Sequence, residues 1–128
     1  MLQYFSQLKT RKARAQQAYL ILLGLAAERK TVTYEQLART LGFENGAGVL
    51  SQTLGHIMFW CAENDLPALT TIVVGKDSGR PGDGLSAVTD REAARERVYG
   101  FDWYDLAPPS PDDLDASYSR GKSTKEAR

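Results

Sequence analysis

The sequence predicts an α+β fold, mostly helical with a small sheet or hairpin, arranged as a winged helix-turn-helix. Two helical segments, over residues 33–41 and 47–64, are separated by a short turn. A β-branched stretch follows at 69–75, and a glycine-rich stretch comes after it at 79–84. This order of helix, turn, longer helix and strand is typical of a fold whose second helix enters a DNA groove.

Length and composition predict one domain with an ordinary globular core. The chain has 128 residues, of which 42% are hydrophobic and 25% charged. That length supports a single core rather than two. The 16 basic and 16 acidic residues balance. A protein that coats nucleic acid without specificity is usually strongly basic, so the balance argues mildly against that class.

The chain divides into three predicted parts. Residues 1–12 form a basic N-terminal extension, residues 13–107 form the winged helix-turn-helix domain, and residues 108–128 form a tail. The tail is rich in proline and aspartate and then basic, a composition that predicts disorder. Charge is uneven along the chain: residues 1–30 hold six basic residues against one acidic residue, and residues 99–116 hold five aspartates and no basic residue.

The first helix is predicted over residues 13–29, where apolar residues recur at helical spacing. Its expected buried stripe consists of Leu20, Leu23 and Ala27 on one face, with Tyr19, Leu22 and Ala26 beside it.

A shorter helix begins at Thr33. Thr33 and Gln36 have the spacing of a capping box, in which the two side chains bond reciprocally to backbone N–H groups. Leu37 and Leu41 lie on the expected buried face, and Gly42 supplies a left-handed stop.

The helix over 47–64 carries an apolar stripe and an opposite, more polar face. The stripe is Leu50, Leu54, Ile57, Met58 and Cys61, and the opposite face is Ser51, Gln52, Gly55, His56 and Phe59. No Arg or Lys occurs between residues 46 and 64. That absence is unusual for a DNA-reading helix, because phosphate contacts supply much of the affinity.

The remaining domain is predicted to hold a strand, a stiff loop and a further helix. Residues 69–75 form the strand, and Pro81 with its neighbouring glycines predicts a loop over 80–84 instead of a second strand. Thr89 begins a capped helix that ends near Gly100. Four apolar or aromatic residues after it should fold back on the core: Phe101, Trp103, Tyr104 and Leu106.

Residues 31–85 resemble the DNA-binding domain of the methylated-DNA–protein cysteine methyltransferases and the related alkyltransferase-like proteins. The resemblance rests on the order of three segments: TYEQLA at 33–38, NDLP at 64–67 and VVG at 73–75. The family's reactive Cys-His pair and its arginine would fall between Pro67 and Val73, where this chain has ALTTI. Gly48 and Val49 stand about where the family's base-stack arginine would be. The resemblance implies a DNA-binding scaffold without alkyl transfer, so we expect no catalytic residue and no enzyme activity.

The leading hypothesis is a non-catalytic protein that binds double-stranded DNA, as a regulator or as part of a mobile element. Ser51, Gln52, Thr53 and His56 are expected to contact base edges. A second set of residues is expected to hold the DNA backbone: Tyr34, Lys76, Arg80, Lys9, Arg11, Lys12 and Arg14.

The alternative is a protein-interaction module, such as a small regulator or inhibitor of a nucleic-acid-handling protein. The zero net charge and the uncharged helix face favour it. An acidic strip formed by Asp102, Asp105, Asp112 and Asp113 could mimic phosphate and occupy a partner's nucleic-acid channel.

Cysteine and histidine usage predicts neither a metal nor a cofactor. Cys61 is the only cysteine and His56 the only histidine. Five residues of helix separate them, about 500° of rotation, so they do not share a face. The N-terminus lacks a signal-peptide core, and the longest apolar stretch, 18–27, is about half a membrane span. We therefore expect a cytoplasmic protein that does not bind membranes.

Overall fold

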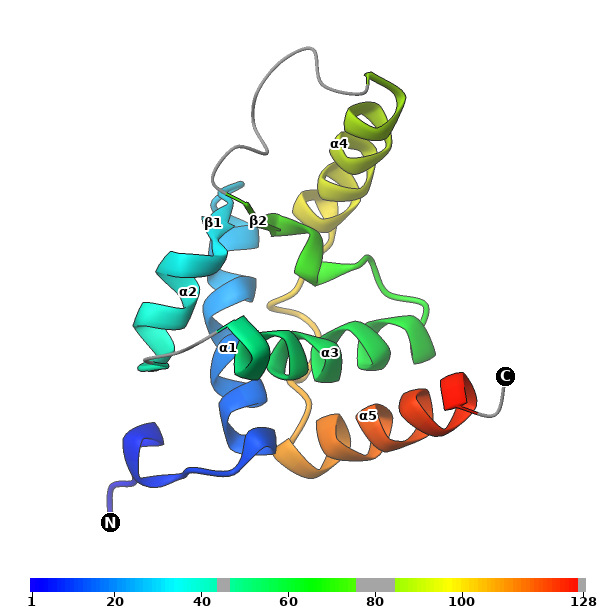
Figure 1. Ribbon diagram of the computed structural model, residues 1–128. Helices are drawn as coiled ribbons and strands as arrows, with labels where there is room; N and C mark the ends of the chain where they lie inside the picture. The colour runs from blue at the N-terminus through cyan, green and yellow to red at the C-terminus, as the bar shows by residue number, and fades with distance from the viewer. Residues whose placement is uncertain (44–46, 76–84, 127–128) are drawn as a thin grey trace.

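The computed structural model describes residues 1–43, 47–75 and 85–126 (Figure 1). The described chain contains five α-helices: α1 (Arg11–Ala27), α2 (Tyr34–Leu41), α3 (Ala47–Glu63), α4 (Leu85–Gly100) and α5 (Pro111–Glu126). Strands β1 (Val32–Thr33) and β2 (Val73–Val74) form its sheet, and two 3₁₀ helices are present, η1 (Phe5–Gln7) and η2 (Leu69–Ile72). The predicted α+β class, mostly helical with a small sheet, is confirmed.

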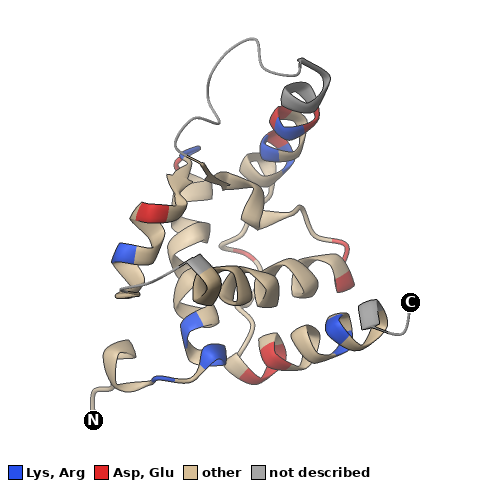
Figure 2. Cartoon of the chain, in the orientation of Figure 1, with Lys and Arg blue, Asp and Glu red and all other residues tan. Residues whose placement is uncertain are grey.

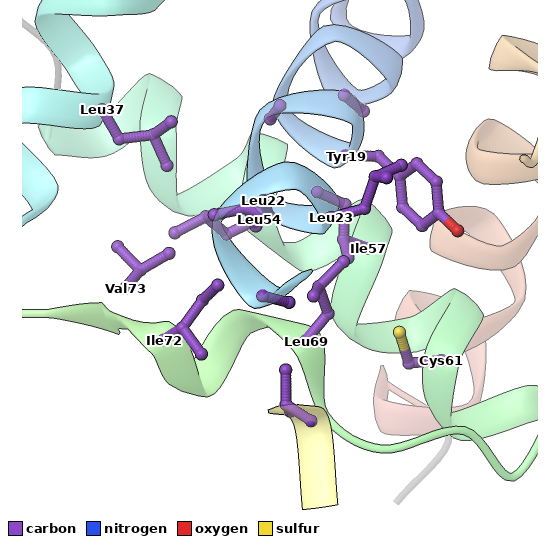
Figure 3. Packing of buried hydrophobic residues seen from close by; sticks show 14 of the residues in the cluster. Tyr19, Leu22, Leu23, Leu37, Leu54, Ile57, Cys61, Leu69, Ile72 and Val73 are labelled. Carbon is purple, nitrogen blue, oxygen red and sulfur yellow. The ribbon is translucent and has the colours of Figure 1, made fainter. Parts of the chain in front are cut away.

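Helix α1 lies at the centre of the hydrophobic core. The Thr10 hydroxyl accepts the Ala13 N–H at 3.3 Å and caps the helix. The helix therefore begins at Arg11, two residues before the predicted start. The buried face includes Tyr19, Leu22 and Ala26, which meet side chains from α2, α3 and η2 (Figure 3). Leu20 and Ala27 were predicted to be buried and are exposed, because the neighbouring elements contact the adjoining stripe of α1.

Helix α2 begins and ends as its sequence predicts. Gln36 N–H donates to the Thr33 hydroxyl at 3.0 Å, and Thr33 N–H donates to the Gln36 side chain at 3.1 Å. Gly42 has a φ of 80°, and Leu37 and Leu41 are buried. The reciprocal cap is worth about 1 kcal/mol to a helix of this length.

The sheet is smaller than predicted and its strands are parallel. Val32 pairs with Val73, and Thr33 pairs with Val74. The stretch 69–72, expected to be strand, is the 3₁₀ helix η2. Leu69 and Ile72 are both fully buried there, because three residues per turn place both side chains on the same side. The glycine-rich stretch 80–84 lies outside the described residues.

Residues 111–126 form helix α5, so over this range the prediction of a disordered tail at 108–128 is wrong. Ser110 and Asp113 bond reciprocally, each backbone N–H donating to the other's side chain at 3.0 Å. Pro111 occupies the first helical position, where its missing N–H costs nothing. Leu114 is fully buried, and α5 runs alongside α3 in the same direction (Figure 1). The packed unit therefore extends through residue 126.

Helix α4 begins at Leu85 rather than at Thr89, so Thr89 lies inside the helix. Of the residues that follow it, Trp103 is buried and its indole N–H donates to the Val98 carbonyl at 2.8 Å. Phe101 and Leu106 pack against the core as predicted, whereas Tyr104 is 69% exposed. None of the helices among the described residues is long and apolar enough to cross a membrane.

Candidate nucleic-acid interface

The first two turns of α3 present small and neutral side chains to solvent. Gly48, Ser51 and Gln52 are exposed, and Val49 is 45% exposed. Figure 2 shows no charged residue along α3 until Glu63 at its end. Ser51 and Gln52 are thus accessible, as their proposed contact with base edges requires.

Thr53 and His56, also expected to contact bases, are 1% exposed and cannot do so in this structure. The Thr53 hydroxyl donates to the Val49 carbonyl at 2.9 Å. The His56 Nδ1 donates to the Gln52 carbonyl at 2.7 Å. Thr53 faces the core side of α3, and α5 covers His56.

Tyr118 on α5 is the residue that closes the His56 face of α3. Its ring stacks on the imidazole with centroids 4.1 Å apart and planes 2° apart. A Cβ on Gly55 would lie 3.1 Å from the Tyr118 ring, so the absence of a side chain there lets α5 approach. Sequence reasoning missed this contact because it treated α5 as disordered. The aromatic spacing of Tyr118 from Leu114, four residues earlier, was the available signal.

A hollow of about 260 Å³ lies on one side of these turns, between α2, α3 and η2. Tyr34, which is 50% exposed, forms one wall. The other lining residues are Ser51, Leu54, Gly55, Met58 and Thr70. Met58 was predicted to be buried and is 46% exposed, because it faces this hollow. We call this site the tyrosine hollow.

A second hollow, of about 160 Å³, lies on the opposite side of α3. It is lined by three cationic residues and three uncharged ones: Lys9, Arg11, Arg14, Phe43, Val49 and Thr53. Val49 and Met58 are nine residues apart, about 180° of helical rotation, which places the two hollows on either side of the exposed turns. We call this site the basic hollow.

The four cations of residues 9–14 differ in their partners. Lys12 pairs with Asp112 at 2.5 Å, and this carboxylate raises the pKa of the lysine. Arg14 donates to the Leu41 carbonyl and the Gln17 side chain, both at 2.8 Å, and lies over the Phe43 ring. Lys9 and Arg11 are exposed and form no ion pair within the described part of the chain. Lys76 and Arg80 lie outside the described residues.

The aspartates of the proposed acidic strip occupy different settings. Asp112 holds Lys12, and Asp113 caps α5, where bonds from Ser110 hold the pKa of its carboxyl below the usual range. Asp102 and Asp105 are exposed in the connection between α4 and α5. Two of the four carboxylates, those of Asp112 and Asp113, therefore already form contacts within the fold.

The far end of α3 is fixed to α5 by Glu63. Its carboxylate accepts bonds from Arg120 at 2.7 and 2.8 Å and from the Ser117 hydroxyl at 2.7 Å. These bonds, led by Arg120, lower the pKa of Glu63 to about 2. The clasp keeps α5 on α3, whose opposite face is buried in the core through Leu50, Leu54 and Ile57.

Cys61 is in no position to act as a nucleophile. It is 1% exposed, and burial raises the pKa of its thiol to about 11. Thiolate is the reactive form, so this thiol is inert at neutral pH. Within the described residues, no group of three or more His, Cys, Asp or Glu residues is arranged to hold a metal ion.

Comparisons with protein-family models, with curated proteins and with solved structures return no match to this chain.

Proposed function

We propose that this chain is a non-catalytic, winged-helix-type protein that binds duplex DNA through the first two turns of α3. One observation carries the proposal: an exposed, uncharged helix start flanked on one side by a cation-lined hollow. Helix α2 ends at Leu41 and packs beside α3, which begins at Ala47, as the first helix of a helix-turn-helix pair packs beside the second. The resemblance of residues 31–85 to an alkyltransferase-type DNA-binding domain is consistent with this assignment.

The side chains on this face suit contact with base edges. Gln52 can pair with adenine, and the Ser51 hydroxyl can pair with several base edges or with phosphate. The glycine and the small side chains leave room for a groove wall to approach the helix backbone. Because α3 lacks Arg and Lys, affinity has to come from cations on neighbouring elements, and Lys9 and Arg11 lie beside this face.

The protein-interaction alternative has less support. Asp112 and Asp113, half of its acidic strip, already serve as partners of Lys12 and Ser110. A protein partner would have to displace these intramolecular contacts.

A charge placed on the open face tests the proposal. In Ser51→Glu a carboxylate would face the DNA phosphates and bases, and we expect duplex affinity at 50 mM salt to fall by at least about tenfold. The measurement is fluorescence anisotropy with a labelled random-sequence duplex. Ala93→Glu, which adds the same charge on an exposed site of α4, is the matched control and should lower affinity less than about twofold.

Two results would count against the proposal. One is wild-type protein that does not bind the duplex at 50 mM salt. The other is an equal loss of affinity in both variants, because the α3 face would then have no special part. Thermal melting of each variant shows whether the fold is intact.

A further inference from the structure

The basic hollow combines three features that together define an anion site. Its wall carries three cationic side chains, Lys9, Arg11 and Arg14. None of the three forms an ion pair among the described residues, although acidic side chains of α5 begin close by, where Asp112 holds Lys12. The hollow also opens beside the first turn of α3, whose backbone dipole places partial positive charge there.

Arg14 is held in place before any ligand arrives. One guanidinium nitrogen, Nη1, bonds to the Leu41 carbonyl and to Gln17, and the group lies 5.7 Å from the centre of the Phe43 ring. These contacts fix the cation between α1 and the end of α2. A guanidinium with no carboxylate beside it retains N–H groups for an acceptor, and its planar fork matches a phosphate.

The size and shape of the hollow limit the ligand. Its volume of about 160 Å³ suits a phosphate group with its ester carbons. The half-buried Phe43 and the exposed Val49 supply apolar surface suited to those carbons. A phosphate carried on a longer polymer would lie with its chain outside the hollow and along α3.

We propose that the basic hollow binds one phosphodiester of a DNA strand that runs over the surface where α1 and the start of α3 meet. Arg14 is the cation of this site that contacts within the protein hold in place, and Lys9 and Arg11 are its exposed cations. Lys12 takes no part, because Asp112 already neutralises it. The proposal deepens the proposed function and rests on it, since the exposed turns of α3 lie directly beside the basic hollow.

A pair of adjacent alanine variants tests the phosphodiester site. Arg11→Ala removes a lining cation, whereas Lys12→Ala removes a cation one residue away that is paired outside the hollow. We expect Arg11→Ala to reduce the slope of log affinity against log salt concentration by about 1, and Lys12→Ala to leave that slope unchanged. The measurement is fluorescence anisotropy of a labelled duplex between 50 and 200 mM salt, a range over which counterion release changes the affinity strongly.

Inorganic phosphate provides an arm that does not depend on duplex binding. In amide NMR at constant ionic strength, phosphate should shift the Arg11, Gly48 and Val49 resonances of wild type and of Lys12→Ala. The same titration of Arg11→Ala should show at least about threefold weaker binding.

The duplex and phosphate experiments distinguish a failure of the proposed phosphodiester site from a failure of the proposed function. Equal salt slopes for both variants would overturn the phosphodiester site, and duplex binding that stays sensitive to Ser51→Glu would leave the proposed function intact. Inorganic phosphate could shift these resonances while Arg11→Ala leaves the salt slope of duplex affinity unchanged. That result would overturn the assignment of the site to a DNA phosphodiester.

Discussion

The Tyr19 side chain is well packed, but its buried hydroxyl lowers the stability of the fold. Its ring meets Trp60 edge-on at 5.5 Å and Trp103 at 6.4 Å, and it is fully buried. Its hydroxyl oxygen has no hydrogen-bond partner among the described residues. A buried hydroxyl without a partner loses its hydration and regains nothing in the fold.

Removal of that hydroxyl should therefore stabilise the protein. We expect Tyr19→Phe to raise the free energy of unfolding by about 1 kcal/mol, measured by urea denaturation. Tyr104→Phe, at a side chain 69% exposed, is the control and should change it little. A loss of stability in Tyr19→Phe would mean that the hydroxyl has a partner in solution.

At the level of elements, α2 was predicted and α5 was missed. Thr33, Gln36 and Gly42 are local signals, and each acts as its spacing indicates. Residues 111–126 contain many Ser, Lys and Asp residues, and their helix depends on contacts with distant partners such as Glu63 and His56. Composition alone cannot reveal such contacts, so the burial of His56 beneath Tyr118 was missed with them.

Tertiary contacts that local sequence does not reveal also explain why the sheet is shorter than predicted. The β-branched residues Thr70, Thr71 and Ile72 favour a strand locally, but tertiary packing overrides this preference. Burial of both Leu69 and Ile72 against the core selects the 3₁₀ turn instead. Of the proposed base-contacting residues, Ser51 and Gln52 stay exposed, whereas Tyr118 of α5 covers the same side of α3 one turn later, at Gly55 and His56.

The clasp between α3 and α5 should make stability depend on pH in acid. The folded protein holds the pKa of Glu63 at about 2, below its ordinary value of 4.5. The clasp is therefore fully effective above pH 4.5 and is lost as the pH falls toward 2. We expect Glu63→Gln to be less stable than wild type by about 0.5–1 kcal/mol at pH 6, with the difference narrowing toward pH 2.

Urea unfolding at pH 6, 4 and 3 measures this difference. Arg120→Ala should show the same narrowing, because it removes the main partner that lowers the pKa of Glu63. A gap between wild type and Glu63→Gln that stays constant from pH 6 to pH 3 would contradict the clasp.

Across the whole molecule, one ion pair lies beside the basic hollow. The ion pair of Asp112 with Lys12 joins the start of α5 to the start of α1, where Figure 2 shows acidic and basic positions next to each other. The carboxylate competes with any phosphate that approaches the N-terminal cations.

Neutralising Asp112 should therefore strengthen DNA binding. We expect Asp112→Asn to raise duplex affinity by about threefold at 50 mM salt and to steepen the salt slope by up to about 1, as Lys12 is released. Asp105→Asn removes the same charge from the exposed connection and should have a smaller effect. The protein-interaction alternative gives no reason for affinity to DNA to rise, so an unchanged or reduced duplex affinity in Asp112→Asn would favour it.

The most direct test of the DNA-binding proposal is an amide NMR titration of the full chain with a short duplex at 50 mM salt. The DNA-binding proposal predicts that the shifted resonances cluster at residues 48–52, at Tyr34 and at residues 9–14, and that those of α4 do not shift. Absence of any shift, or shifts confined to α4 and the connection around Asp102 and Asp105, would contradict it.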